Sequence, residues 1–436
     1  MIRSATQGST DALAEGLSGT AQNITIAIAI GAVLALVLAA VMRRQVLGAG
    51  EDSAAERSSP AVEQDGAAAH PRRRVATLGW VAVALALLLF ALPADSWGMR
   101  AARSAAFVVG VAFSAVLGYF ARTLALRADI RVAAAAGTGA GGYERDLRLA
   151  SRTGGVVGLT TVGLGLLGAA IAVLVYGRDA PILLEGLGLG AAVSAVFLRL
   201  GARTGTGAAD IGMAPDLFGS YVVTIAAAVF LGPGAIGDDG LVLPLLIPAI
   251  GAVAAALAVL LVRVRQGVPG PRSIRNEFSA GVGVALLGAA LACFLVLPSR
   301  FSDLTGAGVT VAALNGDPRT VALGAVFLGI LLVVLIRWIS AHVSSVSRPP
   351  LVPPGFGSGL ESAVYTTLVI AGALYLAFLL AGGVLVLATF LVALVGCGVL
   401  STVGVIVAMD TVARVSDDAR GIAEMEGDVD EEGGAV

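Results

Sequence analysis

The stretch VLVLATFLVALVGCGVLSTVGVIVAM, residues 384–409, contains no charged residue along its whole length. About 20 apolar residues in a row are enough for a helix to cross the hydrocarbon core of a bilayer. A helix satisfies its backbone hydrogen bonds internally, as a lipid environment requires. This stretch therefore predicts a transmembrane helix, and it indicates the fold class of the whole chain.

Comparable apolar runs recur from this segment back to the N-terminus. The 436 residues are 57% hydrophobic and 13% charged, whereas about a quarter of the residues in a soluble domain are charged. The composition excludes the soluble class and predicts an all-α fold, a polytopic transmembrane helical bundle that crosses the cell membrane many times. We expect about eleven membrane helices, at residues 24–42, 75–93, 103–122, 154–176, 181–200, 213–232, 240–262, 279–298, 319–338, 362–382 and 384–409.

The distribution of arginine predicts the orientation of these helices. With the N-terminus outside, 22 of the 28 basic residues fall in cytoplasmic segments and 6 fall outside. Cytoplasmic loops carry the excess of basic residues in membrane proteins, so we expect the N-terminus outside and the C-terminus inside. The predicted parts are an external tail at 1–23, a membrane domain at 24–425 with a cytoplasmic linker at 45–71, and an acidic disordered tail at 426–436.

The rarer residue types exclude several functions. All basic residues are arginine, so a P-loop lysine and a Schiff-base lysine are excluded. Cys293 and Cys397 sit in apolar segments and are interpreted as packing residues. His70 and His342 lie in loops, which argues against a histidine metal site. The chain has no basic stripe with interleaved aromatics, so nucleic acid is not an expected partner.

The first candidate site lies between the fifth and sixth predicted helices. The segment FLRLGARTGTGAADIGMAPDLFGSYVVT, residues 197–224, contains Arg199, Arg203, Asp210 and Asp216 at the cytoplasmic ends of these helices. Charges at membrane depth often mark functional sites. Arginines can hold an anion and paired carboxylates can hold a divalent metal. The alternative is a loop with ordinary interfacial charges.

The second candidate site follows the last predicted helix. Asp410 and Asp417 are seven residues apart, which is about two turns of a helix, so both point to one face if the helix continues. Carboxylates on one face suit Mg²⁺, which prefers one or two carboxylates together with water and phosphate oxygens. The alternative is a solvated helix end on the cytoplasmic side.

In these two clusters and elsewhere, the sequence resembles the membrane-bound proton- or sodium-translocating pyrophosphatases. The likeness covers nearly the whole chain, in order. The matching motifs are GYFARTLALRADIRVAAA (118–135), GGVVGLTTVGLGLLG (154–168), RLGARTGTGAADIG (199–212), GMAPDLFGSYVVT (212–224), GLES (359–362) and GVLSTVGVIVAMDTVARVSDDARGIAEM (398–425).

The resemblance implies hydrolysis of magnesium pyrophosphate on the cytoplasmic side, coupled to H⁺ or Na⁺ export. By position, it assigns Asp210, Asp410 and Asp417 to the binding of Mg²⁺ and pyrophosphate, as metal and catalytic residues. It assigns Arg199 and Asp216 to an ion gate beneath that site. The expected partners are the lipid bilayer, pyrophosphate, and either a second copy of the chain in a homodimer or a second membrane subunit.

The chain also departs from the family's pattern. Gly207 stands in place of a lysine, and Gly212 serves two motifs that a long aspartate-rich segment separates in the family. Gly219 and Val223 occupy the two positions at which the family has its gate glutamate. We also expect the family's last five helices to be missing. These departures predict a catalytically impaired protein, a pseudoenzyme, or one part of a pump. The alternatives are a non-catalytic regulatory or scaffolding partner, and a decaying reading frame.

Overall fold

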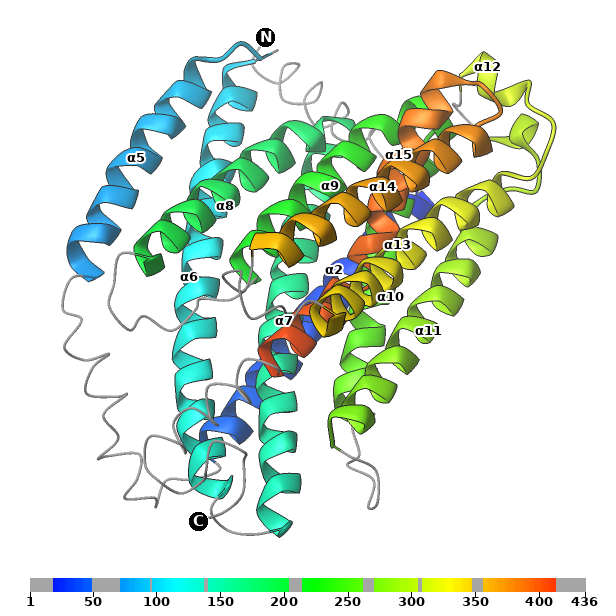
Figure 1. Ribbon diagram of the computed structural model, residues 1–436. Coiled ribbons are helices and arrows are strands. Elements are labelled where there is room, and N and C mark those ends of the chain that lie inside the picture. Colours follow the sequence, from blue (N-terminus) through cyan, green and yellow to red (C-terminus); the bar gives the residue numbers. More distant parts are fainter. Residues whose placement is uncertain are drawn as a thin grey trace.

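The structure is a computed structural model that describes residues 19–48, 71–94, 96–136, 140–203, 214–261, 270–304, 308–346 and 356–412. All the regular secondary structure in these ranges is helical, and the long helices pack into one bundle (Figure 1). The helices in chain order are α2 (Gly19–Gly48), α5 (Pro71–Ala91), α6 (Trp97–Ala136), α7 (Ala140–Tyr176), η1 (Gly177–Asp179), α8 (Ala180–Arg203), α9 (Ala214–Ile236), α10 (Asp239–Leu261), α11 (Gly270–Val296), η2 (Phe301–Asp303), α12 (Val309–Ala312), α13 (Pro318–Val346), α14 (Phe356–Leu380) and α15 (Leu385–Leu400).

The predicted polytopic bundle is confirmed, because each of the eleven predicted ranges falls on a helix. Among the described residues, nine helices are long and apolar enough to cross a membrane, judged by length and composition. One of these nine, Leu149–Leu198, extends through α7, η1 and α8 and so covers two predicted helices. The predicted helix at 75–93 corresponds to the shorter apolar helix Thr77–Ala91. The tail at 426–436 and most of the linker at 45–71 lie outside the described residues.

The predicted membrane span at 384–409 is confirmed as the span Leu385–Val412, but its helix is interrupted. α15 ends at Leu400, and a further helix, residues 403–412, begins after a two-residue break. At the break the Thr402 amide donates a hydrogen bond to the Val399 carbonyl, three residues back instead of four. The Ser401 and Thr402 hydroxyls donate to the Gly398 and Val399 carbonyls, each at 2.7 Å. Serine and threonine hydroxyls compete with the backbone for helical carbonyls, which favours a break at this pair.

Glycine allows the helices to approach each other closely. A Cβ added at Gly186 or Gly190 of α8 would collide with the carbonyl oxygens of Arg103 or Phe107 in α6. A Cβ at Gly110 of α6 would in turn collide with the carbonyl of Leu187 in α8. Small residues at such crossings replace the hydrophobic effect as the source of helix association in lipid.

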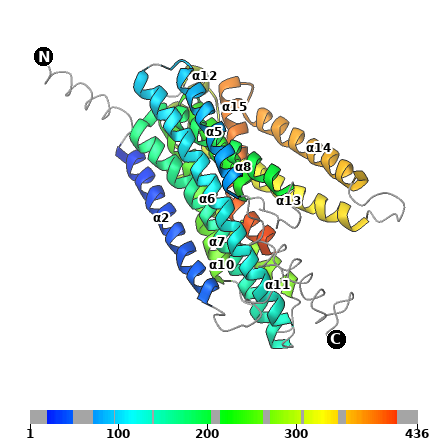
Figure 2. The same ribbon diagram turned by 90° about the vertical axis from the view of Figure 1, so that its left-hand side faces the viewer.

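The interior of the bundle forms two large apolar clusters. One joins α2, α6, α7, α8, α9, α10 and the helix at 403–412. The other joins α9, α10, α11, α13, α14 and α15. Figure 2 shows α2 and α14 on opposite sides of the bundle. Only 11% of the span Leu360–Leu380 in α14 is buried, so α14 presents most of its surface to the surroundings.

Two polar contacts fix helix ends. Arg103, which is 7% exposed, donates to the carbonyls of Leu89 and Leu92 at 2.6 and 2.8 Å and so caps the C-terminal end of α5. Arg178 in η1 forms an exposed ion pair of 2.7 Å with Asp238 in the turn between α9 and α10. These contacts tie neighbouring helices together at the end of the bundle where α9 ends and α10 begins.

Candidate functional site

The first candidate site lies where α8 ends and α9 begins. These two helices run antiparallel and in close contact, since a Cβ at Gly219 of α9 would lie 3.2 Å from the Ala192 amide nitrogen of α8. Arg199 lies in the last turns of α8, and its side chain is outside the described part of the structure. Asp216 lies in the first turn of α9. The backbones of these two residues are therefore at the same end of the bundle.

The start of α9 is held firmly, which fixes the position of Asp216. Phe218 is fully buried and packs against Phe113 of α6, with ring centroids 6.3 Å apart. The Ser220 hydroxyl donates to the Asp216 carbonyl at 3.1 Å. Asp216 is half-buried, and a carboxylate in the first turn interacts favourably with the helix dipole. The buried ring and the short hydroxyl contact therefore hold the first turn of α9, and Asp216 with it, in place.

The second candidate site rests on the close contact of the helix at 403–412 with α7. A Cβ at Gly154 or Gly158 of α7 would collide with the carbonyl oxygens of Ala408 or Gly404. Asp410 is half-buried on this helix, next to the buried Thr411, whose hydroxyl donates to the Val407 carbonyl at 2.8 Å. The position of Asp410 therefore depends on glycines of α7.

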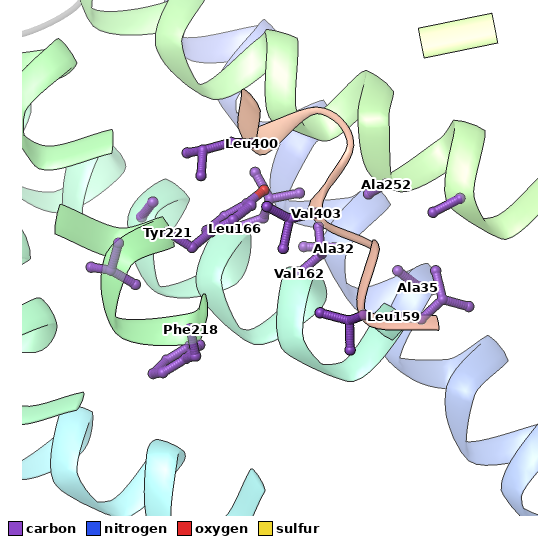
Figure 3. Packing of buried hydrophobic residues seen from close by; sticks show 14 of the residues in the cluster. Ala32, Ala35, Leu159, Val162, Leu166, Phe218, Tyr221, Ala252, Leu400 and Val403 are labelled. Carbon is purple, nitrogen blue, oxygen red and sulfur yellow. The ribbon is translucent and has the colours of Figure 1, made fainter. Parts of the chain in front are cut away.

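The two sites lie toward the same end of the bundle. Figure 3 shows Tyr221 of α9 beside Leu400 and Val403, at the start of the helix that carries Asp410. α9 and α15 are antiparallel. The step from Tyr221 back to Asp216 and the step from Val403 forward to Asp410 therefore lead toward the same end of the bundle. The structure thus brings Asp216 and Asp410 to one end on helices that pack together.

The proposed metal set is only partly visible. Asp210 and Asp417 lie outside the described residues. Within the described ranges, no three histidine, cysteine, aspartate or glutamate side chains gather into a group that could hold a metal ion. The magnesium ligand set stays a prediction.

Sequence reasoning missed Tyr221 and the break at 401–402. Tyr221 is completely buried among apolar residues of α7, α15 and the helix at 403–412. The signal was present in the motif GMAPDLFGSYVVT, because a phenol in an apolar membrane segment is a polar group at membrane depth. The Ser401-Thr402 pair is the corresponding signal for the break.

Comparison with known proteins gives a consistent match over most of the chain. The sequence model of the family described as inorganic H⁺ pyrophosphatase matches residues 33–214 and 211–435. A protein of Streptomyces coelicolor called a K(+)-insensitive pyrophosphate-energized proton pump is 45% identical in an alignment that covers 94% of this chain and 59% of that protein. The protein of the same name from Streptomyces avermitilis is 43% identical and is covered to 59%.

A more distant protein of the same name, from Chloroflexus aurantiacus, is 30% identical over 74% of this chain and 48% of its own length. The chain thus spans about three-fifths of the two Streptomyces proteins and about half of the third.

Proposed function

Because this chain belongs to the inorganic H⁺ pyrophosphatase family of membrane proteins, we propose that it takes part in pyrophosphate hydrolysis coupled to proton translocation. The observation that carries the proposal is the arrangement of Asp216 and Asp410, two carboxylates on packed antiparallel helices at one end of the bundle. Arg199 belongs to the same end by its place in α8. This end is proposed to face the cytoplasm, as the arginine distribution predicts, with the N-terminus outside and the C-terminus inside.

The proposed ion gate consists of Arg199 and Asp216. A carboxylate and a guanidinium at the ends of neighbouring helices attract each other more strongly near the low-dielectric membrane than in water. Protonation of Asp216 would remove that attraction, so a proton arriving at this carboxylate would loosen the contact between the ends of α8 and α9. This is the proposed step by which a proton passes between the ends of α8 and α9.

The proposed pyrophosphate site consists of Asp210, Asp410 and Asp417. Their carboxylate oxygens are the donor type that Mg²⁺ prefers, and the half-buried Asp410 is held by the close contact between its helix and α7. Bound Mg²⁺ would neutralise charge on the phosphate oxygens. The carboxylates would orient the metal–pyrophosphate complex at the mouth of the bundle, above the gate.

We propose further that the chain alone hydrolyses pyrophosphate poorly. Pyrophosphate hydrolysis needs cationic groups at the leaving oxygens, and the loss of one such donor costs about 10²–10³ in rate. This sequence contains no lysine, and Gly207 stands where the family has one. A second membrane subunit is the proposed source of further cationic groups. The absence of lysine equally favours the alternative function, a non-catalytic regulatory or scaffolding partner of a pump.

The test uses the purified full chain in lipid vesicles. With Mg²⁺ and pyrophosphate present, we expect phosphate release no higher than from empty vesicles, and no gradient by a pH-sensitive dye. Isothermal titration of the same sample with magnesium pyrophosphate should still show binding. Asp410→Asn should weaken that binding by about tenfold or more, whereas Asp303→Asn, at the exposed turn η2, should not change it.

Phosphate release together with a gradient would overturn the proposed impairment and show that a site without lysine performs the reaction. Absence of binding in both the unmodified chain and Asp303→Asn would overturn the pyrophosphate site and leave the regulatory alternative.

A further inference from the structure

The Tyr221 hydroxyl is a polar group in the buried interior of the bundle. Tyr221 is 0% exposed, and Leu166 of α7 lies beside its ring (Figure 3). A Cβ added at Gly165 of α7 would lie 2.6 Å from the ring, so the phenol is held tightly in place. Within the described ranges, its oxygen makes no hydrogen bond to protein. Buried hydroxyls in proteins almost always have a partner, and where protein supplies none a bound water does.

The hydroxyl points toward the break at 401–402, between α15 and the helix at 403–412. In Figure 3 the Tyr221 oxygen is directed between Leu400 and Val403, the residues on either side of the break. Among the backbone hydrogen bonds of the described part of the chain, none ends on the Ser401 carbonyl. A break of this kind leaves backbone polar groups in the membrane interior, and such breaks persist only where protein or bound solvent surrounds them.

The surroundings decide the chemical class of the occupant. Cys397, one turn before the break, is fully buried and belongs to a neighbouring apolar cluster. The other residues that Figure 3 labels around the phenol are apolar. A cation here would lack a compensating carboxylate and would be costly to bury. A neutral molecule that both accepts from a phenol and donates to a carbonyl fits the site.

We propose that a single water molecule binds between the Tyr221 hydroxyl and the backbone of the break at 401–402. It accepts the phenolic hydrogen and donates to a freed backbone carbonyl, so one water satisfies both orphaned groups. The inference rests on burial and hydrogen bonding and does not depend on the proposed function.

The first test is hydroxyl-radical footprinting of the purified full chain in vesicles, read by mass spectrometry. Radicals formed from bound water oxidise the side chains next to it. Tyr221 and Leu400 should be labelled, whereas Phe218 and Phe390, which are equally buried, should stay unlabelled. Equal protection of all four residues would overturn the water.

The second test is thermal unfolding of Tyr221→Phe, with Tyr375→Phe as the matched control because Tyr375 on α14 is 63% exposed. Removal of the water's partner should lower the midpoint by about 2 °C and abolish the labelling of Leu400, and the control should do neither. An unchanged or raised midpoint would mean that the phenol is unpaired and the site dry. A lowered midpoint without labelling in the unmodified chain would mean a direct bond to the backbone, and would also overturn the proposal.

Discussion

Gly154→Ala should separate α7 from the helix that carries Asp410. The added Cβ would overlap the Ala408 carbonyl oxygen and lie 3.0 and 3.1 Å from the Ala408 carbonyl carbon and Cα. Carbon atoms pack at about 3.5–4.0 Å, so the two backbones must move apart by about 1 Å. Backbone atoms cannot turn aside as a flexible side chain does, so the movement extends to the whole helix.

The magnitude follows from two opposing terms. Overpacking of this kind costs about 1–3 kcal/mol, and the replacement of glycine by alanine within a helix gains about 0.5–1 kcal/mol. The net destabilisation should lie between about 0 and 2.5 kcal/mol, near the middle of that range. The matched control is Gly283→Ala in α11, where a Cβ would meet no atom within 4 Å. The control retains only the helical gain, so the two substitutions should have opposite signs.

The assay is thermal unfolding of each purified variant in the same detergent, followed by circular dichroism. The midpoint should fall for Gly154→Ala and stay level or rise for Gly283→Ala. If Gly154→Ala is as stable as Gly283→Ala, the direct backbone contact between α7 and the helix at 403–412 does not exist, and the reasoning on Asp410 fails with it.

Three further predictions concern other parts of the bundle. Arg103→Met should destabilise the protein by about 1–3 kcal/mol in the same assay, because the Leu89 carbonyl, in a buried bond, and the Leu92 carbonyl, in a part-buried one, lose their donor. Arg103→Lys should restore part of the loss, and equal stability of all three proteins would contradict the cap. Arg178→Ala should cost less than about 1 kcal/mol and its effect should vanish in high salt, because its pair with Asp238 is exposed; a larger, salt-independent loss would show that the pair is screened from solvent. The orientation is tested with a membrane-impermeant maleimide, which should label Asp303→Cys in intact cells and label Glu361→Cys only after the membrane is opened. The reverse pattern would invert the predicted topology. The buried Cys293 and Cys397 should stay unlabelled in both variants.

The fold could be predicted because each membrane helix gives its own signal in the sequence, a long apolar run. Each long apolar run was expected to form a helix whatever its neighbours were, because lipid offers no hydrogen-bond partners to the backbone N–H and C=O groups of an unfolded segment. Helix ends were less predictable: α6 continues to Ala136 and α7 begins at Ala140, well outside the predicted apolar ranges 103–122 and 154–176. Those extensions carry charges, and a hydrophobic pattern gives no signal where a helix leaves the membrane.

The break at 401–402 could not be predicted from hydrophobicity, because Ser401 and Thr402 are tolerated inside continuous membrane helices when their hydroxyls bond to the preceding turn. Whether the backbone follows depends on the neighbours, and here Gly251 of α10 leaves room for the Ser401 carbonyl. The pairing of helices was equally hidden. Glycines in apolar helices favour close packing, yet nothing in the sequence says that Gly154 meets Ala408.

The candidate site was predicted in part. Asp216 and Asp410 were chosen from local charge and from the family resemblance, and their common end of the bundle follows from the antiparallel course of α9 and α15. Tyr221 was overlooked, since it carries no charge and only the charged residues of the segment 197–224 were considered as site residues. Asp210 and Asp417 remain sequence predictions.

The contact of the helix at 403–412 with earlier helices has a consequence for biogenesis. This helix packs against Gly154 and Gly158 of α7 and against the neighbouring part of α10. Both α7 and α10 are synthesised well before residue 403 leaves the ribosome. α14, with little of its span buried, can enter the bilayer from the translocon without waiting for a partner. The broken helix cannot, because its exposed backbone groups would meet lipid. The segment that carries Asp410 should therefore join the bundle only after α7 and α10 are in place, so a defect in α7 would first be seen as failed insertion of a helix made some 250 residues later.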